Sequence, residues 1–178
     1  EKKRTQKLFV TNIFCKLQRE TQKAAFVYLK INPKNKCIMK VYQTKEIKNI
    51  SLLGSDGSGK TTLTEALLYE SGQIQRRGRI TAKNTVSDYF PVEQEYGYSV
   101  FSTPFHTEWN GKKLNFIDCP GSDDFIGATI TALSVTDTSV IMINGQNGVE
   151  VTTQNHFRYC EKLKKPVIFL INRLDDEK

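Results

Sequence analysis

The segment that most constrains the fold of this chain is a glycine-rich run of eight residues, Gly54-Ser55-Asp56-Gly57-Ser58-Gly59-Lys60-Thr61. It fits the phosphate-binding pattern G-x-x-x-x-G-K-[ST] at every fixed position, and Thr62 continues it. An apolar, strand-like run over residues 47–53 precedes it, and a helix-like run over residues 62–69 follows it. A chance glycine-rich turn would lack this strand–loop–helix context, so the segment predicts a phosphate site in an α/β domain.

The residues of this loop have distinct physical roles at a phosphate site. Glycines let backbone N–H groups turn inward toward the α- and β-phosphates of a nucleotide. The positive end of the helix that begins near Gly59 points at the same phosphates. Lys60 is expected to reach the β- and γ-phosphates, and the Thr61 hydroxyl is expected to hold Mg²⁺. The loop therefore predicts a nucleoside triphosphate site.

Two further motifs each follow an apolar, strand-like run. They are Asp118-Cys119-Pro120-Gly121 after residues 114–117 and Asn172-Arg173-Leu174-Asp175 after residues 167–171. At the end of a strand, Asp118 can hold Mg²⁺ through water, and the Gly121 N–H can contact the γ-phosphate. The Asp175 carboxylate can accept two N–H groups from guanine, a pair that adenine lacks. Guanine is therefore favoured, and an ATP-using P-loop enzyme is the weaker alternative.

With these motifs, residues 39–178 resemble the translational GTPases, and most closely the elongation factor G group. The family motifs N-K-x-D, D-x-P-G-H and E-R-G-I-T correspond to residues 172–175, to Asp118-Cys119-Pro120-Gly121-Ser122, and to Glu95-Tyr96-Gly97-Tyr98-Ser99. The particular substitutions in these motifs resemble a Bacteroides-type paralogue of elongation factor G.

The resemblance implies a P-loop GTPase fold that binds GTP or GDP with Mg²⁺ and acts with the ribosome in translocation. Ser99 would supply a switch hydroxyl to Mg²⁺ beside Thr61 and Asp118. Asn172 and Asp175 would read guanine, and Arg173 would stack over the base. The resemblance also implies a domain that is incomplete at its C-terminus. A further guanine-contacting loop, a strand, a helix and the later ribosome-binding domains would follow residue 178.

Three positions around the expected attacking water depart from the family pattern. Ser122 replaces the histidine that orients the water, and Asp56 and Tyr98 replace two aliphatic residues beside it. Gly57 stands where the family usually has an aspartate. A serine hydroxyl is shorter than an imidazole and carries no positive charge. We therefore expect weak or absent GTP hydrolysis and a factor that works by occupancy. An ordinary hydrolysing GTPase, or a ribosome-protection-type factor, stays the alternative, with another group positioning the water.

The pattern of the chain predicts a mainly parallel sheet with helices on both faces. Strands are expected near residues 46–53, 98–109, 114–118, 139–144 and 166–171, and helices near 60–70, 125–136 and 151–163. Asn110-Gly111 predicts a tight hairpin between the second and third strands. Residues 71–95 show little periodicity, which is typical of a long functional loop, and they fall where the first switch belongs. The ligand is expected at the carboxyl ends of the strands.

The net charge of +7 is concentrated at the beginning of the chain. Residues 1–38 hold ten lysines and arginines against two acidic residues, whereas the remainder carries a net charge of −1. This basic leader either binds ribosomal RNA or has no folded role. The Arg76-Arg77-Gly78-Arg79 cluster leaves a similar choice, between RNA phosphates and a solvated loop.

The remaining features are unspecific. The four cysteines form no C-x-x-C pair, and no apolar run reaches the length of a membrane helix, so a monomeric, reduced, cytoplasmic protein is expected. Cys119 is interpreted as a small residue in a tight turn, with a thiol-sensitive site as the alternative. His106 and His156 lie in no metal-ligand pattern, and surface or packing roles are expected for both.

Overall fold

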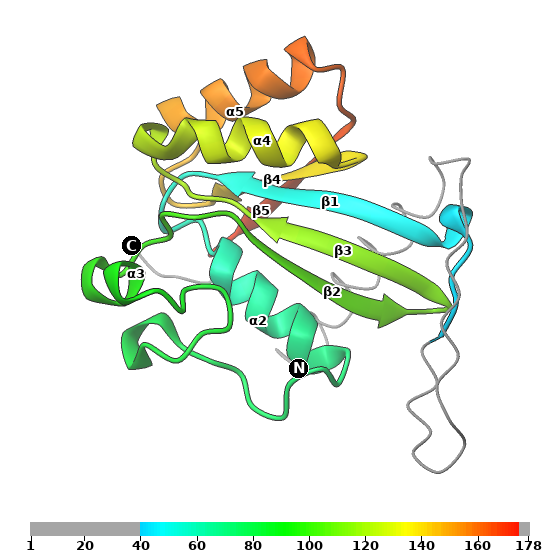
Figure 1. Ribbon diagram of the computed structural model, residues 1–178. Helices are drawn as coiled ribbons and strands as arrows, with labels where there is room; N and C mark the ends of the chain where they lie inside the picture. The colour runs from blue at the N-terminus through cyan, green and yellow to red at the C-terminus, as the bar shows by residue number, and fades with distance from the viewer. Residues whose placement is uncertain (1–39, 175–178) are drawn as a thin grey trace.

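The computed structural model describes residues 40–174, with one sheet between two layers of helices (Figure 1). The predicted leader, residues 1–38, and Asp175 lie outside the described residues. The strands are β1 (Ile47–Gly54), β2 (Thr103–Trp109), β3 (Lys112–Asp118), β4 (Thr138–Asn144) and β5 (Val167–Asn172). The helices are α2 (Lys60–Glu70), α3 (Pro91–Tyr96), α4 (Ile126–Val135) and α5 (Val151–Lys162), with 3₁₀ turns at Thr44–Glu46, Ile80–Ala82 and Asp123–Phe125.

The sheet has the strand order β2-β3-β1-β4-β5 and is mainly parallel, as predicted. β1 pairs in parallel with β3 and β4, and β4 pairs in parallel with β5. Among the described strands only β2 runs antiparallel, to β3, through the expected hairpin in which Asn110 and Gly111 both have positive φ, at 45° and 76°. Leu52 of β1 pairs with Asp118 of β3, so the parallel strands end at one edge of the sheet.

Two apolar clusters cover the two faces of the sheet because successive side chains of a strand point to opposite sides. Leu52 of β1 packs with Leu67 of α2 on one face, whereas the adjacent Leu53 packs with Leu133 of α4 and Cys160 of α5 on the other. Figure 1 shows α2 on one side of the sheet and α4 and α5 on the opposite side. β4 is buried almost throughout, as expected of a strand covered on both faces. These two layers confirm the predicted sheet with helices on both faces.

Two predictions about the segment before β2 were wrong. The strand expected from Tyr98 begins at Thr103, and the stretch expected to lack regular structure contains a 3₁₀ turn and α3. α3 begins with Pro91 at its first position and ends at Gly97, whose φ is 75°. The Glu93 carboxylate then accepts the backbone N–H groups of Val100 and Phe101, each at 3.0 Å, and these groups therefore do not join the sheet. Across residues 40–174, no helix has the length and apolar character needed to cross a membrane.

Candidate nucleotide site

The phosphate loop connects the end of β1 to the start of α2 in a conformation that requires glycine. Gly54 and Gly59 have φ values of 133° and 99°. A Cβ atom on Gly54 would collide with the Met142 carbonyl oxygen, and one on Gly59 would collide with the Asn172 side chain. The loop is thus packed between β4 on one side and the end of β5 on the other, at the carboxyl edge of the sheet, as predicted.

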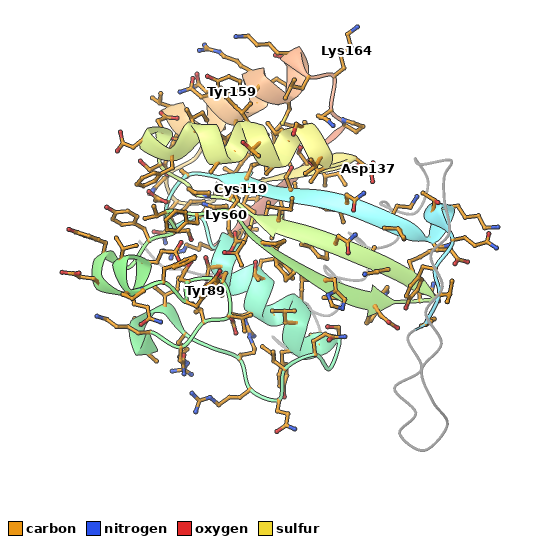
Figure 2. All side chains as sticks on the ribbon, in the orientation of Figure 1. Lys60, Tyr89, Cys119, Asp137, Tyr159 and Lys164 are labelled. Carbon is orange, nitrogen blue, oxygen red and sulfur yellow. The ribbon has the colours of Figure 1, made fainter. Side chains whose placement is uncertain are left out.

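Lys60 lies at the start of α2, and its ammonium group is directed into the loop. It is 6% exposed, and its Nζ donates to the carbonyl oxygens of Gly54 and Ser55, each at 2.9 Å. Burial lowers the pKa of Lys60, and the carboxylates of Asp118 and Asp56 oppose that shift. Figure 2 shows Lys60 near Cys119, where α2 meets the ends of the strands. This side chain is the buried cation that phosphate binding needs.

The carboxylate of Asp118 lies beside the hydroxyl of Thr61. Thr61 Oγ1 and Thr64 Oγ1 each donate to Asp118 Oδ2 at 3.2 Å. Asp118 Oδ1 is buried and has no hydrogen-bond partner among residues 40–174. Burial raises the pKa of Asp118 to about 6, against the opposing charge of Lys60. An orphaned carboxylate oxygen beside a threonine hydroxyl is the oxygen donor set that Mg²⁺ prefers, so these residues fit the ion.

The hydroxyl of Ser99, the expected switch hydroxyl, is linked to the site of Thr61 and Asp118 by the carboxylate of Asp88. Ser99 Oγ donates to Asp88 Oδ1 at 2.7 Å, and both residues are buried. Burial raises the pKa of Asp88, and the hydrogen bond from Ser99, the nearby Thr61 hydroxyl and the charge of Lys60 partly offset this shift. Sequence reasoning missed both Asp88 and Thr64. A lone aspartate in a polar stretch carries no signal of its own, because only its burial beside Thr61 distinguishes it.

The loop after β5 contacts the phosphate loop through the side chain of Asn172. The side-chain Nδ2 donates to the Ser58 carbonyl oxygen at 3.0 Å, and the backbone carbonyl oxygen of Asn172 accepts the Gly145 N–H at 2.8 Å. Arg173 and Leu174 are exposed, and Arg173 has a positive φ of 57°. The structure thus brings Asn172 to the site, whereas Asp175 lies outside the described residues.

Comparison with known proteins identifies this arrangement. The model of the elongation factor Tu GTP-binding domain family matches residues 45–178. This chain belongs to that family.

The matched segment is similar to proteins of three names. It is 36% identical to an elongation factor G-like protein of Thermotoga maritima over 75% of this chain and 19% of the relative. It is 35% identical to the mitochondrial ribosome-releasing factor 2 of Candida dubliniensis over 75% of this chain and 16% of the relative. It is also 35% identical to the tetracycline resistance protein TetO of Streptococcus mutans over 74% of this chain and 21% of the relative. The chain thus spans about a fifth of the length of these relatives.

Two solved structures are similar in fold. A Thermus thermophilus protein matches with a TM-score of 0.72 and 35% identity, over 73% of this chain and 20% of the other. The elongation factor SelB of Methanococcus maripaludis, solved with a GTP analogue, matches with a TM-score of 0.56 over 74% of this chain and 23% of the other. At 18% identity, the second match supports the fold alone. The chain is therefore a translational GTPase domain of the elongation factor G type.

Two buried glutamates hold the segment between α2 and β2, where the first switch is expected. Glu65 of α2 accepts the backbone N–H groups of Gly78 and Val86, at 2.6 and 2.5 Å. Glu93 of α3 holds residues 100 and 101, as described above. These backbone N–H groups lack partners in a sheet or helix, and the two carboxylates accept their hydrogen bonds instead. Sequence reasoning missed both roles, because the donors lie 13 and 21 residues from Glu65 along the chain.

The three residues expected around the attacking water make other contacts. Ser122 Oγ donates to Asp124 Oδ2 at 3.2 Å and accepts the Asp124 N–H at 3.3 Å. The ring of Tyr98 is 39% exposed and lies 6.4 Å from that of Phe125, centroid to centroid. Asp56 is exposed, and a Cβ atom on Gly121 would collide with its Oδ1 and lie 2.6 Å from Lys60 Nζ. Asp56 and Lys60 therefore crowd the place where the γ-phosphate is expected.

The side chains of Cys119, His106 and His156 differ in burial and in their contacts. Cys119 is fully buried, and burial raises the pKa of its thiol to about 12, which disfavours a reactive thiolate. His106 is exposed. His156 is fully buried on α5, and its Nδ1 accepts the Gly54 N–H at 3.1 Å. Packing was expected of His156, but this polar contact with the phosphate loop was not.

Proposed function

We propose that this chain is the GTP-binding part of an elongation factor G-type translation factor that acts in ribosomal translocation and hydrolyses GTP weakly or not at all. It would bind GTP and GDP with Mg²⁺ held by Thr61, Asp118 and Ser99. The observation that supports the proposal is a contrast between two groups of residues in one site. The groups that hold the nucleotide are buried and hydrogen-bonded, whereas those beside the expected attacking water have lost the family's chemistry.

Nucleotide binding is supported by the phosphate loop and its supports. Lys60 is buried with its charge directed into the loop, and Asp118 keeps one oxygen without a partner among the described residues. Asn172 links the loop to the segment that carries Asp175, which would accept the two guanine N–H groups. An adenine base would leave that carboxylate unpaired, which costs binding free energy.

Weak hydrolysis is supported by the chemistry of two side chains. Ser122 is engaged with Asp124, and its hydroxyl cannot carry the positive charge of an imidazolium. Asp56 lies beside Gly121 and adds negative charge where charge develops as the phosphate bond breaks. Loss of one such contributor lowers a rate by roughly two to four orders of magnitude.

A second candidate function is an ordinary hydrolysing GTPase or a ribosome-protection factor. The observation that favours it is the 35% identity to a tetracycline resistance protein, TetO. In this case the ribosome, or another group of the protein, would position the attacking water in place of Ser122.

The partners in this proposal follow from the resemblance and from exposed charge. The ribosome is the expected partner. Arg76, Arg77 and Arg79 are exposed on the first-switch loop and would meet RNA phosphates. The protein would act as a cytoplasmic monomer with no membrane contact.

Turnover of GTP by the full-length protein, with and without ribosomes, is the decisive test. We expect ribosomes to raise the rate little, and a rate similar to that of an ordinary elongation factor G would refute the proposal. Competition of labelled GDP by GTP and ATP tests the base, because ATP is expected to compete far more weakly. Asp175→Asn should shift binding from guanine toward xanthine nucleotides, since its amide offers a donor to the extra carbonyl of xanthine.

A reconstruction series tests which group limits hydrolysis. Ser122→His alone should restore little turnover, because Asp56 and Tyr98 remain. The triple variant Ser122→His, Asp56→Ile, Tyr98→Ile should turn over faster than each single variant. Equal rates for the single and triple variants would show that these positions do not limit hydrolysis.

A further inference from the structure

One buried polar side chain touches the phosphate loop without belonging to any nucleotide-binding motif. His156 lies on α5, which packs against the face of the sheet opposite to α2 (Figure 1). Its side chain is fully buried, and its Nδ1 accepts the backbone N–H of Gly54 at 3.1 Å. Gly54, the first residue of the phosphate loop, is thus hydrogen-bonded to a side chain of a helix that begins almost a hundred residues later in the sequence.

Gly54 connects this imidazole to the phosphate-binding lysine. The Gly54 N–H donates to His156, while the Gly54 carbonyl oxygen accepts Lys60 Nζ at 2.9 Å. Gly54 is also held in the sheet, because it pairs with Met142 of β4, and the Met142 carbonyl oxygen occupies the place that a Cβ atom would need. The two peptide groups that meet at Gly54 are therefore both hydrogen-bonded, the first to His156 and the second to Lys60.

The contact requires one protonation state of the ring. Nδ1 can accept a hydrogen bond only when it carries no proton, so the proton of the neutral ring resides on Nε2. That Nε2 is buried and has no partner among residues 40–174. Burial lowers the pKa of His156 to about 4; the charge of Lys60 acts in the same direction, and Asp123 opposes it. The ring is therefore a fixed acceptor near neutral pH.

We propose that His156 is a positioning residue of the phosphate loop, whose Nδ1 sets the orientation of Gly54 and, through its carbonyl oxygen, that of Lys60. The inference rests on the proposed function, because the ligand whose affinity it affects is a guanine nucleotide. It extends that function to a residue on α5 that contacts the loop from outside the motifs.

Two substitutions distinguish a positioning role from simple packing, because the two roles predict opposite orders of nucleotide affinity for the variants. His156→Asn places an amide oxygen near the position of Nδ1 and can accept the Gly54 N–H. His156→Leu fills the buried site with an apolar side chain but provides no acceptor. Positioning predicts that the Asn variant of the full-length protein binds fluorescent GDP close to wild type and that the Leu variant binds about ten-fold more weakly. Packing alone predicts that the Leu variant binds better than the Asn variant.

Each outcome decides the question. Equal affinities of the Leu variant and wild type, or an Asn variant as weak as a folded Leu variant, overturn the inference. Thermal unfolding without nucleotide shows whether each variant is folded. Long-range ¹H–¹⁵N spectra of the wild-type protein provide a test that does not depend on nucleotide affinity, with the His156 signals assigned by their loss in the folded Asn variant. A ring protonated on Nδ1 overturns the inference. If wild type binds no guanine nucleotide, the proposed function fails, whereas the spectra still test the hydrogen bond.

Discussion

Two groups of residues are expected around the same phosphate position, and they differ in how the protein holds them. The phosphate-holding group is Lys60, Thr61 and Asp118, and the water-facing group is Asp56, Tyr98 and Ser122. The first group is buried, and each member is hydrogen-bonded within the site. The second group is partly or fully exposed, and Ser122 and Tyr98 bind or pack against the 3₁₀ turn that follows β3.

This difference predicts that binding and hydrolysis are separable in this protein. Truncation of a buried, hydrogen-bonded side chain leaves its partners unsatisfied, which costs stability as well as affinity. Exposed side chains can change at little cost to stability. A sequence can therefore lose the chemistry of hydrolysis while it keeps the nucleotide site, and the predictions below probe that boundary.

The largest effect is expected from Lys60→Ala. The variant loses the buried cation of the loop, and the charge-assisted contacts to phosphate are lost with it. We expect GTP and GDP affinity to fall by more than about a hundred-fold. Fluorescent nucleotide titration measures this, with Lys45→Ala as the matched control, since Lys45 is exposed just before the opposite end of β1. An affinity within ten-fold of wild type would remove Lys60 from the phosphate-holding group.

Thr61→Ala should have a smaller effect that depends on Mg²⁺. The hydroxyl lies 3.2 Å from Asp118 Oδ2 and is the proposed ligand of the ion. We expect GTP affinity with Mg²⁺ to fall by roughly ten- to a hundred-fold, as for loss of a contact to a charged group, and affinity in a chelator to change little. Equal losses with and without Mg²⁺ would contradict the assigned role. Thr64→Val is the control, because its hydroxyl contacts the same oxygen from one helical turn further on.

Asp118→Asn should weaken Mg²⁺-dependent binding and yet stabilise the nucleotide-free protein. Burial raises the folded pKa of Asp118 to about 6 from an ordinary 3.8, so the stability that its protonated form provides is lost as pH rises through 6. At pH 7.5 the neutral amide avoids the buried charge, and we expect a gain of roughly 2 kcal/mol in the free energy of unfolding.

Urea unfolding at two pH values checks the origin of that gain. The difference between Asp118→Asn and wild type should shrink at pH 5, where Asp118 is largely protonated in the folded protein. A gain that is independent of pH would point to packing instead of charge.

The sequence predicted the parts of this site that are defined by local pattern. The phosphate loop, the strand ends that carry Asp118 and Asn172, and the hairpin at Asn110-Gly111 all depend on neighbours within a few residues, and the structure has each of them. The parts that were missed join distant residues. Glu65 and His156 contact backbone groups 13 to 102 residues away. Their roles depend on burial created by the whole fold, which short-range periodicity does not encode.

The smallest effect is expected from Ser122→Ala, which tests the water-facing group by removing a hydroxyl. Ser122 Oγ bonds to Asp124, accepting its N–H and donating to its carboxylate, so its role is to cap the 3₁₀ turn at Asp123–Phe125. Loss of such an exposed cap costs about 1 kcal/mol of stability or less and should leave GDP and GTP affinity within two-fold of wild type. Turnover should not change, because a hydroxyl bound to Asp124 has no part in orienting water. Equilibrium titration and single-turnover hydrolysis on the same preparation measure both quantities. If removal of the hydroxyl lowered turnover ten-fold while affinity stayed constant, Ser122 would be a working catalytic group, and the division between the two groups would fail.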